Sequence, residues 1–286
     1  YDITLIPFPA DLMNPHWQAF AATPEQILQK YPQPLHALAD RQIPALVLRN
    51  AYNPEHCTGL MQRFSERGYF NQETVGVESQ LNGGPYLDLG TSLGRVGADP
   101  EAFFAHAERT HALFSHLFDG FDDPVRTMYE ALAELAPDNK VLTAHEPNDR
   151  LYGPAIFRIY HGDEGHRPHF DSVARRSKSE YAVGDFAHQF AGVLCLQSAE
   201  PDGEPFIYDC YADDEVNAVI SSGEFDDYVQ AQKIAHAQVL LEPGDLYFFY
   251  TENIHTVPPV VRTSPRVVLA FFFAMSADRD EIFVWS

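Results

Sequence analysis

Short β-prone runs dominate the second half of the chain. From about residue 151 onward, runs rich in Val, Ile, Phe and Tyr alternate with turns that contain Gly and Pro. The runs cover residues 155–160, 189–197, 205–209, 237–241, 245–250, 266–275 and 281–285. Many short strands separated by turns are typical of a β-sandwich or barrel. The pattern predicts a jelly-roll core, or double-stranded β-helix, over residues 151–286.

The first half of the chain carries helix signals instead. Pairs of a capping residue followed by proline stand at Thr23-Pro24, Asn53-Pro54, Asp99-Pro100 and Asp123-Pro124, and each predicts the start of a helix. A short strand is expected near residues 43–48, and an inserted helix near 222–236. We expect a mainly β fold with α, in which residues 1–150 form a helical and mixed N-terminal half packed against the jelly roll in a single domain, residues 1–286.

Residues 70–98 form a long Gly-containing stretch between two predicted helices. Long loops in compact domains are often lids or disordered segments. Tyr86, Leu87 and Leu93 are the apolar residues in this stretch that could cover a pocket. They are therefore candidate substrate contacts.

Composition limits the partners. The net charge of −22 repels nucleic acid and anionic membrane surfaces, although a basic peptide stays possible. The longest apolar run, residues 267–275, is too short to span a bilayer, and no basic-then-apolar leader opens the sequence. Three cysteines without paired spacing fit a reduced, cytoplasmic protein. We expect a small-molecule substrate and neither nucleic acid nor membrane as a partner.

Three residues are candidate ligands for a metal ion: His169, Asp171 and His255. A His-x-Asp pair arises by chance roughly once in a chain this rich in both residues, and it occurs twice, at 161/163 and 169/171. The second copy follows a β-prone run and a polar loop, and alternate residues of an extended segment share one face. Two histidines and one carboxylate bind one face of Fe(II) and leave the other positions open. The alternative is that these side chains make only structural hydrogen bonds.

Two groups of basic residues are candidate anion sites. Arg266 opens the apolar run 267–275, where a cation needs an anionic partner, and a guanidinium holds a carboxylate through two parallel hydrogen bonds. A salt bridge within the protein is the alternative. Arg175 and Arg176 follow Asp171 closely, so they either bind an anionic group of a substrate or form a solvated loop paired with acids.

The order of His169-Phe170-Asp171, His255 and Arg266 resembles the Fe(II)/2-oxoglutarate-dependent oxygenase superfamily. Its pattern is His-x-Asp, a distal His and an Arg about ten residues beyond. Tyr160, nine residues before His169, matches a common position on the preceding strand, and this favours the second His-x-Asp pair.

A closer similarity is to the carrier-independent halogenases of hapalindole and welwitindolinone biosynthesis and to the N-succinyl amino acid hydroxylases. The segments that carry it are 202–208, 264–266 and the closing residues 276–286. The similarity extends back to the region from Tyr86 to Phe118.

The resemblance implies that His169, Asp171 and His255 hold Fe(II), and that Arg266 and Tyr160 contact 2-oxoglutarate, with O2 as the other co-substrate. The implied reaction hydroxylates an unactivated C–H bond of an amino acid derivative or alkaloid-like product and releases succinate and CO2. The halogenases carry Gly at the position of Asp171, which leaves room for chloride, so the resemblance implies hydroxylation rather than halogenation here. Desaturation, cyclisation, halogenation by another arrangement and a cupin-like protein that binds metal or ligand without catalysis stay open.

Overall fold

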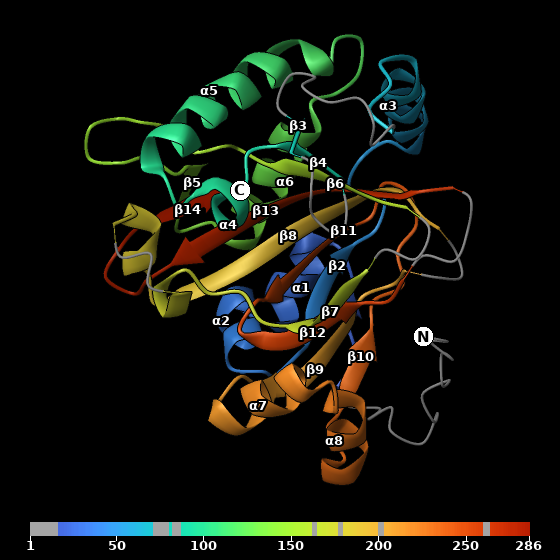
Figure 1. The fold of residues 1–286 in the computed structure, drawn as a ribbon, viewed down its shortest axis with the longest axis vertical. Coiled ribbons are helices and arrows are strands. Elements are labelled where there is room, and N and C mark those ends of the chain that lie inside the picture. The colour runs from blue at the N-terminus through green and yellow to red at the C-terminus, as the bar shows by residue number, and fades with distance from the viewer. Residues whose placement is uncertain are drawn as a thin grey trace.

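The computed structural model describes residues 17–70, 80–81, 87–161, 165–176, 180–199, 203–259 and 264–286 (Figure 1). The strands are β1 Phe20–Ala21, β2 Ala45–Leu48, β3 Gln80–Leu81, β4 Leu87–Gly90, β5 Lys140–Thr143, β6 Ile156–Tyr160, β7 His166–His169, β8 His188–Gln197, β9 Phe206–Tyr211, β10 His236–Gln238, β11 Leu246–Tyr250, β12 Asn253–Val257, β13 Arg266–Met275 and β14 Glu281–Trp285. The helices are α1 Pro24–Lys30, α2 Pro34–Ala39, α3 Pro54–Glu66, α4 Leu93–Val96, α5 Pro100–Leu117, α6 Pro124–Leu135, α7 Asp214–Ser222 and α8 Phe225–Gln232.

Four helices begin at the predicted caps. Thr23 and Gln26 form a reciprocal capping box at α1, and the side chains of Asn53, Asp99 and Asp123 accept backbone N–H bonds at α3, α5 and α6. Each cap satisfies donors that the first helical turn leaves unpaired. The helix predicted near residues 222–236 is α8, Phe225–Gln232. The sequence analysis did not anticipate α7, Asp214–Ser222, which precedes it and ends at Gly223, a left-handed C-cap with φ +80°.

The strands form two sheets. The large sheet has ten strands, in the order β1-β2-β11-β8-β13-β6-β4-β3, with β14 pairing β13 and β5 pairing β14. The small sheet has the order β10-β9-β12-β7. The N-terminal half therefore contributes strands to the large sheet, beside its helices, because β2 pairs with β11 and β4 with β6.

Both faces of the large sheet are buried, and alternate side chains of a strand pack into different apolar clusters. On β13, Leu269, Phe271 and Phe273 belong to the apolar cluster that includes residues of α1, α2, α3 and α6. Val268 belongs instead to a second cluster, which also contains Ile207 of the small sheet. Since successive side chains of a strand point to opposite faces, the same strand packs on helices behind and faces the small sheet in front.

The predicted loop 70–98 is ordered at its end. Residues 87–90 form β4 of the large sheet, and residues 93–96 form the short helix α4. Residues 80–81 form β3, whereas residues 71–79 and 82–86, which include Tyr86, lie outside the described residues, so the lid stays a prediction.

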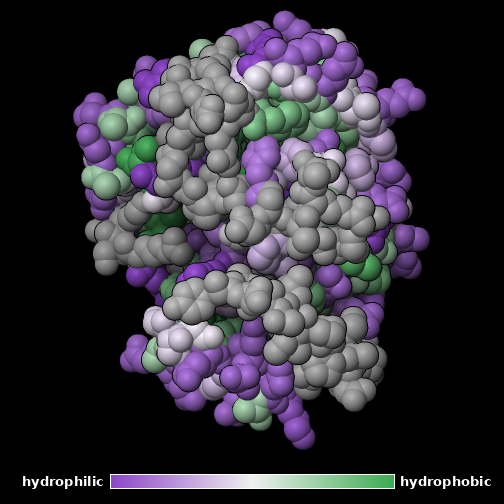
Figure 2. Space-filling model, turned by 45° about the vertical axis from the view of Figure 1, so that its right-hand side comes forward, coloured by the Kyte–Doolittle hydropathy of each residue, from purple (hydrophilic) through white to green (hydrophobic). Residues whose placement is uncertain are grey.

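The described surface in Figure 2 is mostly hydrophilic, in keeping with the charge of the chain. Within the described ranges, none of the helices has the length and apolarity needed to cross a bilayer.

Candidate metal centre

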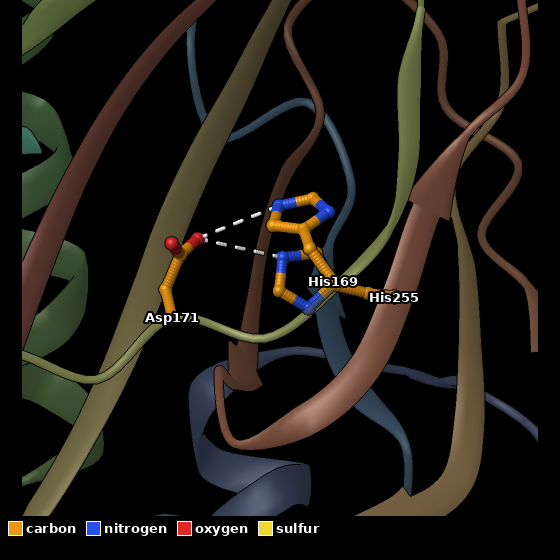
Figure 3. Close-up of side chains that lie close together, drawn as sticks. All are labelled: His169, Asp171 and His255. Carbon is orange, nitrogen blue, oxygen red and sulfur yellow. Dashed lines mark ion pairs between the residues drawn. The ribbon is translucent and has the colours of Figure 1, made fainter. Parts of the chain in front are cut away.

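The two candidate histidine ligands lie side by side in the small sheet. His169 ends β7 and His255 lies within β12, and these two residues face each other across the antiparallel pair. β12 follows β11 after a short turn at residues 251–252. Asp171 lies two residues beyond the end of β7, and Figure 3 shows its carboxylate opposite both imidazole rings.

The three side chains converge closely. Nε2 of His169 and Nε2 of His255 each lie 3.6 Å from Oδ2 of Asp171. One ligand atom from each residue falls within 4.8 Å of the other two. The set is close enough to bind a single ion.

Both imidazoles are oriented as metal ligands. Nδ1–H of His169 donates to the carbonyl of Arg167 at 2.7 Å, and Nδ1–H of His255 donates to the carbonyl of Asn253 at 2.9 Å. A carbonyl can only accept, so each bond leaves the Nε2 lone pair directed at the centre. Such bonds are how proteins fix the orientation of a metal-binding imidazole.

Burial keeps His255 neutral. Desolvation lowers the pKa of this imidazole, with the nearby His169 as a further cause. Nε2 of both imidazoles and the carboxylate of Asp171 face one another. A cation placed among these three ligand atoms would be attracted by all of them, and a set of two nitrogens and one oxygen suits Fe(II). The residues present therefore fit the metal that the sequence implies.

A small cavity of about 60 Å³ lies between the two sheets beside these residues. His169, Asp171 and His255 line it on one side, and Tyr160, Tyr247 and Arg266 of the large sheet on the other. Its remaining wall is largely apolar and includes Ala191, Val193, Phe249 and Val268.

Arg266 brings a positive charge into this cavity. It is 3% exposed and pairs across the sheet with Tyr160, whose ring centroid lies 5.4 Å from the guanidinium carbon. No described carboxylate forms an ion pair with it. A buried guanidinium is costly without an anion, so the cavity is built to receive a negatively charged ligand.

A wider cleft of about 620 Å³ adjoins the small cavity and is also lined by His169 and Asp171. Leu93, a predicted substrate contact, lines it, as do Phe272 and Trp285. Leu87 does not, because it is buried in the core of the large sheet. The assignment of Leu93 to the substrate stays a prediction.

Arg175 lies outside both cavities. Its guanidinium donates to the carbonyl of Ala212 at 2.6 Å, lies 3.9 Å from Glu252 and stacks over Phe170. This arrangement matches the alternative of a loop cation paired with an acid. The side chain of Arg176 lies outside the described part of the chain.

Sequence reasoning missed two cavity residues, Arg158 and His166, which line both the small cavity and the cleft. Arg158 lies two residues before Tyr160, so the alternation of side chains along a strand could have predicted that both lie on the same face of β6. His166 contacts His169, with 4.3 Å between ring centroids, and burial lowers its pKa to about 2. Its position depends on the conformation of β7, for which the sequence held no signal.

Comparison with solved structures reveals a shared fold. An N-substituted L-amino acid dioxygenase from Burkholderia ambifaria AMMD matches with a TM-score of 0.56 and 19% identity, covering 88% of this chain and 90% of that chain. The structure of that dioxygenase in complex with alpha-KG matches with a TM-score of 0.54, 18% identity and the same coverage. A search of curated proteins found no match.

The family follows from the sequence match. The model of the carrier-protein-independent halogenase WelO5 matches residues 19–286. Together with the shared fold, this match identifies an enzyme of the Fe(II)/2-oxoglutarate-dependent oxygenase superfamily. Within that superfamily, the chain belongs to the WelO5 family.

Proposed function

We propose that this enzyme is a 2-oxoglutarate-dependent hydroxylase that oxidises an unactivated C–H bond of a small molecule. The observation that carries the proposal is the pairing of two features at one cavity. Three metal-ligand atoms converge on its small-sheet side, and the buried Arg266 lies on its large-sheet side. In this proposal the two facing sheets form the core of a jelly roll, and residues 1–286 form one oxygenase domain.

His169, Asp171 and His255 would hold Fe(II), and Arg266 would hold the distal carboxylate of 2-oxoglutarate. When bound, the iron and 2-oxoglutarate supply the oxidant: O2 is reduced, 2-oxoglutarate becomes succinate and CO2, and one oxygen atom enters the substrate. The charge of Arg266 selects a dianionic co-substrate, because a neutral molecule would leave the buried guanidinium unpaired. The ring of Tyr160 would hold the guanidinium group of Arg266 through a cation–π contact.

The apolar wall excludes water from the reacting centre. Ala191, Val193 and Val268 line the small cavity from the large sheet, and none of them offers a hydrogen bond to solvent. A dry cavity strengthens the charge pairing of Arg266 and limits side reactions with water. The size of the neighbouring cleft is within the range typical of small-molecule sites.

Asp171 decides between hydroxylation and halogenation. The resemblance to the halogenases places Gly at this position, whereas here a carboxylate lies 3.6 Å from each histidine. Because the carboxylate occupies the ligand position that a halide would need, the family membership of this chain is compatible with a hydroxylase outcome.

The test is an anaerobic titration of the protein with Fe(II) and then with 2-oxoglutarate. A saturable visible charge-transfer band is expected, lost in His169→Ala and weakened in Arg266→Ala. With substrate and O2, the product should be one oxygen atom heavier and form with one succinate per turnover. A product two hydrogens lighter would establish desaturation instead, and a protein that binds iron without developing the band would overturn the proposal.

A further inference from the structure

The cleft beside the metal centre has an unusual charge for this chain. The whole protein has 41 acidic and 19 basic residues. Yet three arginines, Arg95, Arg158 and Arg167, line the cleft, and Asp171 is the single carboxylate among its described lining residues. Since Asp171 faces the two histidines, the remainder of the cleft presents cationic groups.

A buried carboxylate pairs with two of these arginines. Asp88 of β4 is fully buried; its Oδ2 lies 2.7 Å from Nη1 of Arg95, and its Oδ1 lies 4.0 Å from Nε of Arg158. Arg95 lies on α4 and Arg158 on β6, so one carboxylate pairs with cations from two separate elements, closely with Arg95 and at longer range with Arg158. Fixed guanidinium groups lose little conformational entropy when they bind an anion.

Arg167 completes the cationic wall. It is exposed, and it forms no ion pair with any carboxylate in the described ranges. Its backbone carbonyl accepts the Nδ1–H bond of His169, so the residue is attached directly to a candidate metal ligand. A group bound by Arg167 would therefore lie close to the reacting centre.

Another part of the cleft lining is apolar. Leu93, Val173, Phe272 and Trp285 line it, and the rings of Phe272 and Trp285 lie 6.1 Å apart. A ligand that matches both parts has an anionic end and a hydrocarbon or aromatic body.

We propose that the substrate is a carboxylate, with its charged end bound by Arg158 and Arg167 and its apolar body against Phe272 and Trp285. This inference rests on the proposed function, because it assigns the small cavity to 2-oxoglutarate and the wider cleft to the molecule that is oxidised. It favours an acidic amino acid derivative over a neutral or cationic alkaloid, and it argues against a basic peptide.

The experiment compares carboxylic acids with their own primary amides, which match them in shape but carry no charge. Benzoate, phenylacetate, 4-phenylbutyrate and hexanoate, each with its amide, are titrated into protein loaded with Zn(II) and saturated with 2-oxoglutarate, and binding is followed by saturation-transfer NMR. At least one acid should bind about tenfold to a hundredfold more tightly than its amide, the range expected of a charge-assisted hydrogen bond. Equal binding of acids and amides, or no bound acid at millimolar concentration, would overturn the proposal.

Arg167→Gln is the decisive variant, because Arg167 is exposed and its removal leaves no buried charge unpaired. It should reduce acid binding toward the level of the amide and leave amide binding unchanged. Arg175→Gln is the matched control, since Arg175 is nearby but pairs with Glu252 outside the cleft. Loss of acid preference in Arg175→Gln together with its retention in Arg167→Gln would move the anion site to the loop that the sequence suggested.

The same titrations in metal-free protein separate this inference from the proposed function. A preference for acids that persists without metal and disappears in Arg167→Gln supports the cleft, even if the iron titration gives no charge-transfer band. A normal charge-transfer band, together with equal binding of acids and amides, would support the hydroxylase proposal and reject the carboxylate substrate.

Discussion

Thr251 fixes the backbone of Asp171 from both directions. The amide N–H of Asp171 donates to the carbonyl of Thr251 at 2.9 Å, and the hydroxyl of Thr251 donates to the carbonyl of Asp171 at 2.7 Å. The same hydroxyl lies 3.0 Å from the carbonyl of Gln189 on β8. Thr251 is fully buried in the turn between β11 and β12, so it ties the loop that carries Asp171 to the turn that precedes the strand of His255.

This clamp predicts a role for Thr251 in metal affinity. Thr251→Val keeps the shape but removes the hydroxyl, so Asp171 should lose its fixed position and Fe(II) affinity should fall by about tenfold to a hundredfold, as for other residues that orient ligands. Thr251→Ser should restore affinity. The measurement is a direct Fe(II) or Co(II) titration of each variant.

A second buried threonine provides the control for Thr251. Thr110 is also fully buried, and its hydroxyl donates to the carbonyl of His106 at 3.1 Å within α5. Thr110→Val should lower the free energy of unfolding by about 1 kcal/mol without weakening metal binding. Unchanged metal affinity in Thr251→Val would show that the clamp is structural only.

Arg266 should control the affinity for 2-oxoglutarate and leave metal affinity unaffected. Arg266→Ala removes the buried cation, and loss of one partner of such a pair typically costs about 2–5 kcal/mol, so the Kd for 2-oxoglutarate should rise at least about thirtyfold. The Kd of Arg266→Lys should lie between those of the wild type and Arg266→Ala, because lysine keeps the charge but cannot form two parallel hydrogen bonds. Titrating 2-oxoglutarate into the Fe(II)-loaded variants checks this, with the exposed Arg126 replaced by Ala as the control. An unchanged Kd in Arg266→Ala would place the carboxylate elsewhere.

Asp171→Gly should convert the centre into one that needs an external anion. The two histidines and Arg266 remain, so 2-oxoglutarate should still bind, but Fe(II) affinity should fall because one of three ligands is missing. Hydroxylation should drop by about a hundredfold or more, and added chloride should strengthen Fe(II) binding in this variant but not in the wild type. The readouts are metal titration with and without chloride and product mass. Full hydroxylation by Asp171→Gly would show that Asp171 is not a ligand.

His106 should make the fold sensitive to mild acid. It is buried on α5 with its Nδ1 3.1 Å from the hydroxyl of Thr91, and burial, with the nearby Arg109, lowers its pKa to about 4. In the unfolded chain the pKa of His106 is near 6.5. Between pH 6.5 and 4 the imidazole is therefore protonated in the unfolded state and neutral in the folded state. The stability that neutral His106 provides is therefore complete above pH 6.5 and is lost as the pH falls toward 4.

Urea denaturation between pH 4.5 and 7.5 measures this effect. The wild type should lose up to about 1.4 kcal/mol per pH unit through His106, and His106→Gln should show a correspondingly shallower slope. His116, exposed on the same helix, replaced by Gln serves as the control. Parallel slopes for wild type and His106→Gln would contradict the prediction.

Local patterns in the sequence were enough to predict several helices, a central strand and the candidate site residues. The caps at Thr23, Asn53, Asp99 and Asp123 start helices as expected, because capping depends on residues within one helical turn. The β-prone apolar run at residues 266–275 predicted a strand, and β13 occupies that range. The order of His169, Asp171, His255 and Arg266 predicted the candidate site and led to the superfamily, because a ligand set is a matter of residue type and spacing.

Other features were decided only when distant segments came together. The register that sets His255 opposite His169 joins strands that are far apart in the chain, and so does the clamp of Thr251 on Asp171. The pairing of β4 with β6 brings Asp88 beside Arg158 and Arg95 and so creates the cationic wall of the cleft. Strand register and side-chain contacts of this kind depend on packing between whole elements, and a one-residue shift would turn these side chains to the opposite face. The residue types were therefore determined by the sequence alone, whereas their convergence on one cavity and one cleft depended on the tertiary structure.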